Sequence, residues 1–287
     1  MDSSRRNFLR LAGMAAGGGL LGGAGFALGS GKPSRTPDPV GILVDTTRCL
    51  GCRTCEMVCS EKNGLPEPAR MDDDGVFDKE RTTSETSFTV VNRFATAAGP
   101  VFVKRQCMHC LQPACATACL VKAMARTREG PVVWREDRCM GCRYCMLSCP
   151  FDIPKFEYNS TVPKIRKCLM CHDRVQTGGL PACVENCPGE ALLFGKRSKL
   201  IEEARSRIYT NPGTYKSHVY GEHEAGGTSV LVLASASFSR LGFRRDVGLT
   251  PYPELTKGFL YSVPVVLLLW PLFMLGLSQG RGRKEGG

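Results

Sequence analysis

The sequence lacks the motifs that are typical of a catalytic or nucleotide-binding protein. Its 287 residues include only four histidines, and they hold neither a Ser/His/Asp set nor a glycine-rich nucleotide-binding loop. No recognised nucleic-acid motif accompanies the net charge of +11, and part of the basic excess lies near the two ends of the chain. These absences argue against an enzyme with its own catalytic centre and against a nucleic-acid binder.

Cysteine is absent from most of the chain, and the sixteen that are present fall into four tight groups. A disulfide framework has no need of such local clustering, and no cysteine is left over for a nickel site. In chain order the groups are Cys49, Cys52, Cys55 and Cys59; Cys107, Cys110, Cys115 and Cys119; Cys139, Cys142, Cys145 and Cys149; and Cys168, Cys171, Cys183 and Cys187.

The spacing within the groups is typical of 4Fe-4S clusters. The pattern C-x2-C-x2-C-x3-C occurs at Cys49 and again at Cys139, each time with a glycine before the second cysteine. Three thiolates spaced in this way can wrap one face of a cubane, and the glycine lets the backbone approach closely. In the bacterial pattern the fourth cysteine, often followed by proline, serves another cluster. We expect this fourth cysteine at the start of a helix, where the helix dipole favours a thiolate.

Zinc is the main alternative to iron–sulfur clusters. Structural zinc sites use two pairs of ligands at a longer separation, and the fourth group, Cys168-x2-Cys171-x11-Cys183-x3-Cys187, fits that pattern when taken alone. The C-x2-C-x2-C triplets elsewhere in the chain do not fit it. The sequence therefore predicts four 4Fe-4S clusters.

The N-terminal segment 1–30 is predicted to be a twin-arginine signal peptide. Arg5-Arg6 is followed by Phe8 and Leu9 and then by a weakly apolar stretch rich in glycine and alanine. An ordinary secretory signal or a helical anchor is the alternative. Clusters are inserted inside the cell, so their carrier must cross the membrane folded, which the twin-arginine route allows. A linker rich in Pro, Ser and Gly is expected at 31–40.

The C-terminal run 259–277 is predicted to cross the cytoplasmic (inner) membrane. It has 19 residues without a charge, and a helix of that length spans about 28 Å. The basic tail 278–287 should stay in the cytoplasm by the positive-inside rule, which puts the cysteine region on the periplasmic side. A buried core helix is the alternative for this run.

An iron–sulfur domain is expected at 41–240, with a connector at 241–258. Its fold class should be α+β, rich in loops. Segment 63–100 looks like an insertion containing one strand. The predicted elements are strands at 88–91, 132–134 (after a turn at 129–131), 191–194 and 228–233, and a helix at 199–208 with one apolar face.

Several segments resemble the four-cluster ferredoxin-type subunits of membrane oxidoreductases. These subunits include the beta subunits of formate dehydrogenase, dimethyl sulfoxide reductase and polysulfide reductase, and the sequence looks most like the HybA type of hydrogenase-2 subunit. The resemblance implies two pseudo-symmetric bacterial-ferredoxin-like halves plus one transmembrane helix. It is carried by GILVDTTRCLGCRTCEMVC (41–59), KRQCMHCLQPACATAC (104–119), CMGCRYCMLSCPFDIPKFEY (139–158), KCLMCHDR (167–174), GGLPACVENCPGEALLFG (178–195) and VYGEHEAGGTSVLVL (219–233).

The resemblance also implies which cysteines share a cluster, with the first group pairing with the fourth and the second with the third. Site I would hold Cys49, Cys52, Cys55 and Cys187; site II, Cys168, Cys171, Cys183 and Cys59; site III, Cys107, Cys110, Cys115 and Cys149; and site IV, Cys139, Cys142, Cys145 and Cys119.

The family's function implies a subunit that passes electrons in anaerobic respiration. It would connect a catalytic subunit, most of all a nickel–iron hydrogenase, to a quinone-reactive membrane subunit. The alternatives are the same role in a formate dehydrogenase, a molybdenum reductase or a multihaem cytochrome quinol complex, and, in another class, a structural or sensory iron–sulfur protein. An export leader and the lack of an effector domain argue against a sensor.

Polar residues beside the cysteines allow two interpretations. His109 and His172 either tune a cluster or are polar surface or packing residues, and we favour a surface or packing role. Arg105, Arg143 and Lys167 either offset the negative charge of the clusters or are simply solvated.

Overall fold

The computed structural model describes residues 37–282, with side chains described as far as Leu275. The predicted leader at 1–30, most of the predicted linker and the last five residues lie outside the described residues. The first described strand, β1 (Val40–Asp45), begins at the last residue assigned to the linker.

A three-stranded sheet joins the beginning and the end of the iron–sulfur domain. Strand β1 lies between β8 (Leu192–Lys196), to which it is antiparallel, and β9 (Val230–Leu233), to which it is parallel. The predicted strands at 191–194 and 228–233 are therefore confirmed, with shifted ends. Strand β1 is apolar up to its last residue, Asp45, because both of its faces are covered.

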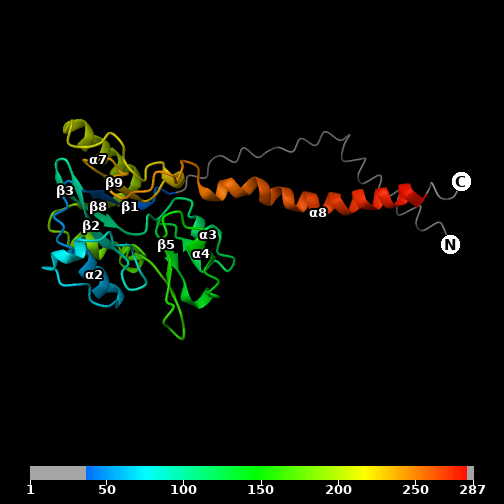
Figure 1. Ribbon diagram of the computed structural model, residues 1–287, viewed down its shortest axis with the longest axis horizontal. Helices are drawn as coiled ribbons and strands as arrows, with labels where there is room; N and C mark the ends of the chain where they lie inside the picture. Colours follow the sequence, from blue (N-terminus) through cyan, green and yellow to red (C-terminus); the bar gives the residue numbers. More distant parts are fainter. Residues whose placement is uncertain (1–36, 283–287) are drawn as a thin grey trace. The chain divides into compact units, whose positions relative to one another are not determined.

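Helix α7 (Arg197–Thr210) covers one face of this sheet (Figure 1). Alternate residues of β1 point to opposite faces. Leu43 packs with Leu200 and Ala204 of α7, whereas Ile42 and Val44 belong to a second core on the cysteine side. The helix predicted at 199–208 is thus confirmed and is slightly longer than expected.

Three antiparallel hairpins make up the other strands. They are β2 (Val90–Thr96) with β3 (Gly99–Arg105), β4 (Met124–Arg126) with β5 (Val132–Trp134), and β6 (Lys155–Phe156) with β7 (Ile165–Arg166). The strand at 132–134 is confirmed. The strand predicted at 88–91 was placed too early, and its partner β3 was not foreseen, because β3 alternates poorly and keeps Lys104 buried.

Each cysteine group contributes to one helix. These helices are α2 (Thr54–Asn63), α3 (Ala114–Thr117), α4 (Tyr144–Leu147) and α6 (Ala182–Glu185). Helix α2 packs on α6, and α3 packs on α4. Helix α5 (His172–Gln176) and the 3-10 turns η1 (Asp74–Phe77), η2 (Glu136–Arg138) and η3 (Glu224–Gly226) lie in the loops.

The expectation that the fourth cysteine begins a helix is wrong. The third cysteine of every group is the second residue of its helix, as Cys55 is in α2. Cys119, Cys149 and Cys187 instead follow two residues after their short helices end, and Cys59 lies in the second half of α2. The helix begins where the three-cysteine loop closes, so only the last cysteine of the triplet can lie in its first turn.

Helix α8 (Tyr252–Gly282) contains the predicted apolar run and begins earlier, inside the expected connector. Its stretch Tyr252–Leu275 is the one helix among the described residues that is long and apolar enough to cross a membrane. None of it is buried within the chain, so the alternative of a buried core helix has no support. Pro264 and Pro271 lie inside this helix.

The packing of β9 on α7 generates the first prediction. Leu231 is fully buried between β1 and α7, and its truncation should cost about 2–5 kcal/mol of folding free energy. We expect Leu231→Ala to lower the midpoint of thermal unfolding clearly. Leu249→Ala, the same change at an exposed leucine, should leave it nearly unchanged. Equal midpoints for the two variants would contradict this account of the core.

Candidate iron–sulfur site

All four cysteine groups share one backbone feature. The residue immediately before the second cysteine has a positive φ in each group: Gly51 (74°), His109 (46°), Gly141 (71°) and Met170 (56°). In the two groups that share the predicted repeat, Arg53 and Arg143 also have the same φ of 59° and ψ of 7°. The sequence predicts this turn only in the two groups where the position is a glycine, whereas in the structure all four groups have it.

A second turn recurs after the fourth cysteine of three groups. The third residue beyond it has a positive φ in Lys122, Asp152 and Glu190. The backbone N–H of each donates to the carbonyl oxygen of the cysteine, at 3.1, 3.2 and 3.1 Å. The first group lacks this turn because helix α2 continues past Cys59.

Backbone amides point at the thiols, as the cubane geometry requires. The N–H of Met170 donates to Sγ of Cys168, and the N–H of Met124 donates to Sγ of Cys119, each at 3.3 Å. Fixed N–H dipoles of this kind stabilise a thiolate or a sulfide without a formal charge. The donor set therefore fits an iron–sulfur cluster.

Cysteines from distant groups meet in two cavities. One is lined by Cys49, Cys52, Cys55 and Cys187, and the other by Cys119, Cys139, Cys142 and Cys145. These are the cysteines expected at sites I and IV. The fourth group is thereby divided, since Cys187 lies with the first group, and a zinc ion held by the fourth group alone does not match this arrangement.

In the other two sets, the effects of thiols on one another's pKa indicate which cysteines are neighbours. Burial is the main cause of the raised pKa of Cys59, and the thiols of Cys168, Cys183 and Cys171 add to it. Burial likewise raises the pKa of Cys110, with further contributions from three thiols, those of Cys107, Cys149 and Cys115. These are the cysteines expected at sites II and III.

Strand pairing accounts for two of these meetings. Val44 of β1 pairs with Leu192 of β8. Cys49 follows Val44 by the same number of residues as Cys187 precedes Leu192, so the pairing brings the two cysteines together. Met124 of β4 pairs with Trp134 of β5 in the same way, with Cys119 before the pair and Cys139 after it. A short stretch of sheet thus brings the two groups of each set together.

The successive sets also adjoin one another. Beyond the dominant effect of burial, thiols of one set raise the pKa of thiols in the next through three pairs: Cys55 with Cys183, Cys168 with Cys107, and Cys115 with Cys145. The order of the sets is therefore I, II, III, IV. Cys52 in the first and Cys142 in the last are the exposed cysteines of the chain.

Burial raises the pKa of these thiols, to about 11 for Cys145 and about 12 for Cys168. Such a thiol stays protonated at neutral pH unless a bound cation stabilises its thiolate. Iron supplies that charge when a cluster binds, so cluster assembly at these sites would release protons.

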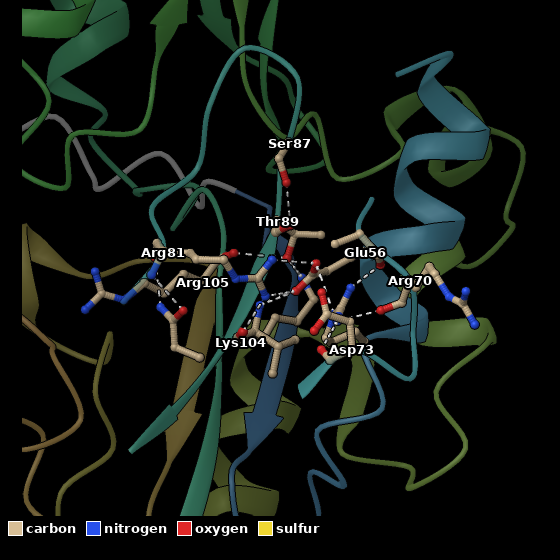
Figure 2. Close-up of polar contacts among 12 residues, drawn as sticks. Glu56, Arg70, Asp73, Arg81, Ser87, Thr89, Lys104 and Arg105 are labelled. Atoms are coloured by element: carbon tan, nitrogen blue, oxygen red, sulfur yellow. Dashed lines mark hydrogen bonds and ion pairs between the residues drawn. The ribbon is translucent and has the colours of Figure 1, made fainter. Parts of the chain in front are cut away.

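A buried ionic network holds the insertion against the first cysteine group (Figure 2). Arg53, which is almost fully buried, donates to the carbonyl oxygens of Arg70 at 3.0 Å and Asp73 at 3.1 Å. Glu56 accepts from Arg81 at 2.6 and 3.0 Å and from the N–H of Val91 at 2.6 Å. Sequence analysis missed this network because the second copy of the repeat has Met146 in place of the glutamate.

His109 is fully buried and behaves as a neutral side chain. Its Nδ1 accepts the N–H of Val132 at 2.9 Å. Burial, and then the charges of Lys167 and Lys104, hold its pKa well below the usual range. This agrees with the packing interpretation. Nδ1 of His172 is also buried and has no partner among the described residues.

The three cations singled out in the sequence have different surroundings. Arg143 is exposed and lies over the rings of Phe156 and Tyr158, at 5.4 and 5.8 Å. Arg105 forms an ion pair with Glu80 at 2.6 Å. Lys167 is buried, so solvation does not account for it.

Comparison with known proteins agrees with this donor set. Residues 99–197 match the family described as a 4Fe-4S dicluster domain. A protein of Nitratidesulfovibrio vulgaris is 48% identical over 288 residues, covering 98% of this chain and 78% of that protein.

Two further relatives are similar to most of the chain. The hydrogenase-2 operon protein HybA of Escherichia coli O157:H7 is 35% identical over 275 residues, which is 83% of each chain. The iron–sulfur subunit of the nitrate-inducible formate dehydrogenase of Escherichia coli K12 is 34% identical over 241 residues, covering 79% of this chain and 81% of that subunit.

The two repeat glycines differ in the room around them, which generates a prediction. A Cβ at Gly51 would lie 2.5 Å from the ring of Phe102, whereas a Cβ at Gly141 would meet only Phe156, at 4.0 Å. Both glycines have a similar positive φ, so strain is matched. We expect Gly51→Ala to retain less iron per chain after purification than Gly141→Ala. Equal iron contents would mean that the contact with Phe102 does not matter.

The buried network generates another prediction. Arg81→Ala leaves the carboxylate of Glu56 buried without its main partner, which should cost about 3–5 kcal/mol. Loss of iron to a chelator should accelerate because α2 carries Cys55 and Cys59. Arg70→Ala, which removes an exposed side chain paired with Asp72, should leave the rate unchanged. The same rate in both variants would show that the network does not hold the cysteine loop.

Proposed function

The chain belongs to the family of iron–sulfur electron-transfer subunits that includes HybA and the formate dehydrogenase iron–sulfur subunits, and from this premise we propose that it carries four 4Fe-4S clusters and relays single electrons between two partner subunits. The observation that carries the proposal is the meeting of each cysteine triplet with a cysteine from a distant group. Clusters of this type cover a wide range of reduction potentials, which the protein adjusts through hydrogen bonds, charge and exposure.

The proposed ligands are the four sets named from the sequence. Site I takes its fourth ligand from Cys187, site II from Cys59, site III from Cys149 and site IV from Cys119. The two cavities support sites I and IV, and the mutual effects on thiol pKa support sites II and III. The contacts of α2 with α6 and of α3 with α4 support two ferredoxin-like halves.

The order of the sites supports a relay rather than a structural or sensory role. Electrons would enter at one terminal site, pass through the two inner sites and leave at the other terminal site. Apolar side chains lie exposed beside the two exposed cysteines: Leu50 near Cys52, and Met140 near Cys142. Such side chains suit contact with a partner subunit.

The partners we propose are a nickel–iron hydrogenase and a quinone-reactive membrane subunit, in a complex of anaerobic respiration. The likeness to HybA over most of both chains favours the hydrogenase. A formate dehydrogenase is the second candidate, supported by a likeness of nearly equal strength. A molybdenum reductase or a multihaem cytochrome quinol complex would use the same relay.

The proposed location is the periplasmic side of the cytoplasmic membrane. Export would use the twin-arginine leader at 1–30, and α8 would anchor the domain with its basic tail in the cytoplasm. The length and composition of α8 support an anchor, as does the row of exposed apolar side chains along it.

Isolation of the native complex tests the function. With an affinity tag on the C-terminal tail, mild detergent should recover the subunit with roughly sixteen irons per chain. The preparation should reduce a quinone analogue when hydrogen is supplied and should contain nickel. Formate-dependent activity without nickel would move the chain to the second candidate. An iron content near four per chain would overturn the four-cluster proposal itself.

A further inference from the structure

Two lysines are buried next to the proposed clusters without a carboxylate partner. The exposed fraction is 5% for Lys104 and 3% for Lys167. Nζ of Lys104 donates to Oγ1 of Thr89 at 2.7 Å and to Oε1 of Gln106 (Figure 2). Nζ of Lys167 donates to the carbonyl oxygens of Cys168, at 2.8 Å, and Val132.

All of these hydrogen-bond partners are neutral. An ammonium group removed from water needs a compensating negative charge, because its desolvation costs more than neutral hydrogen bonds return. Within residues 37–282 neither lysine forms an ion pair with a carboxylate. The compensating charge must therefore come from the cysteine sites.

The surroundings of Lys104 agree with this requirement. Lys104 lines the cavity formed by the site I cysteines. Burial lowers its pKa, but the neighbouring cysteines raise it by more when they are thiolates, as they are in a bound cluster, so the net shift is upward. The thiols responsible come from sites I and II: Cys183, Cys55, Cys168 and Cys59.

Lys167 has the same relation to site III. Its Nζ lies 3.9 Å from Sγ of Cys107. Its charge also opposes the effect of burial on the pKa of two other site III thiols, those of Cys115 and Cys149. Site IV has no buried lysine beside it among the described residues, and the nearest arginine in its loop, Arg143, is exposed.

We propose that Lys104 and Lys167 are fixed counter-charges that raise the reduction potentials of sites I to III and leave site IV without such support. Reduction adds one negative charge to a cluster, so a nearby ammonium stabilises the reduced form more than the oxidised form. Burial prevents water and salt from screening this effect. This inference rests on the proposed four-cluster relay.

A redox titration followed by electron paramagnetic resonance tests the proposal on the purified complex. In Lys104→Met, two of the four midpoints should fall, each by at least a tenfold change in the reduction equilibrium, which is about 59 mV for one electron. In Lys167→Met, one of the midpoints unaffected by the first change should fall. One midpoint should move in neither variant.

Two controls separate charge from shape. Lys104→Arg keeps the positive charge, so its midpoints should stay close to those of the unmodified protein. Lys199→Met makes the same substitution at an exposed lysine on α7 and should leave all four midpoints in place. Four unchanged midpoints in a Lys104→Met protein with full iron content would overturn the proposal.

The iron content of each variant distinguishes a loss of charge from a loss of shape and from a failure of the four-cluster relay. If Lys104→Met loses clusters while Lys104→Arg retains them, the buried charge is required for assembly, in agreement with the proposal. If both variants lose clusters equally, the shape of the lysine matters rather than its charge, and the proposal is wrong. Failure of the four-cluster relay would instead be visible as a low iron content in the unmodified protein.

Discussion

Each proposed cluster needs a fourth thiolate that its own cysteine loop cannot reach, and the path of the chain follows from this requirement. The sheet of β8, β1 and β9 draws residues near position 190 back to the first cysteine group. The hairpin of β4 and β5 draws the second and third groups together. In both cases the paired strands lie close in sequence to the cysteines that they join, so a few backbone hydrogen bonds set the position of a whole site.

The same arrangement concentrates negative charge inside a domain with little regular structure. The four proposed clusters with their thiolates would take the place of much of the hydrophobic core that a domain of this size otherwise has. Buried cations are then part of the architecture, which is why Lys104 and Lys167 are held by neutral oxygens instead of carboxylates. Removing the clusters would leave these ammonium groups buried without compensation, a further reason for the chain to depend on its cofactors for folding.

Sequence reasoning foresaw the elements with a clear local signal: α7 from its apolar face, and the strand at 132–134 from the turn before it. It also found the shared loop where Gly51 and Gly141 mark it. The same loop in the other two groups could not be seen, because His109 and Met170 adopt a positive φ under the constraint of the surrounding fold. Strand β3 and the buried position of Lys104 were also missed. A charged residue is not expected in a buried strand unless its partners are known, and the sequence does not show the partners of Lys104.

The two copies of the repeat show how one backbone can present different surfaces. Arg53 and Arg143 have identical φ and ψ. The insertion at 63–100 covers Arg53, whose guanidinium binds its carbonyl oxygens, whereas Arg143 remains exposed over Phe156. The first loop is therefore rigidly enclosed on one side, and the third is open. A relay that docks two different partners needs unlike ends, and an insertion beside only one copy of a repeated loop produces that difference without changing the cysteine geometry.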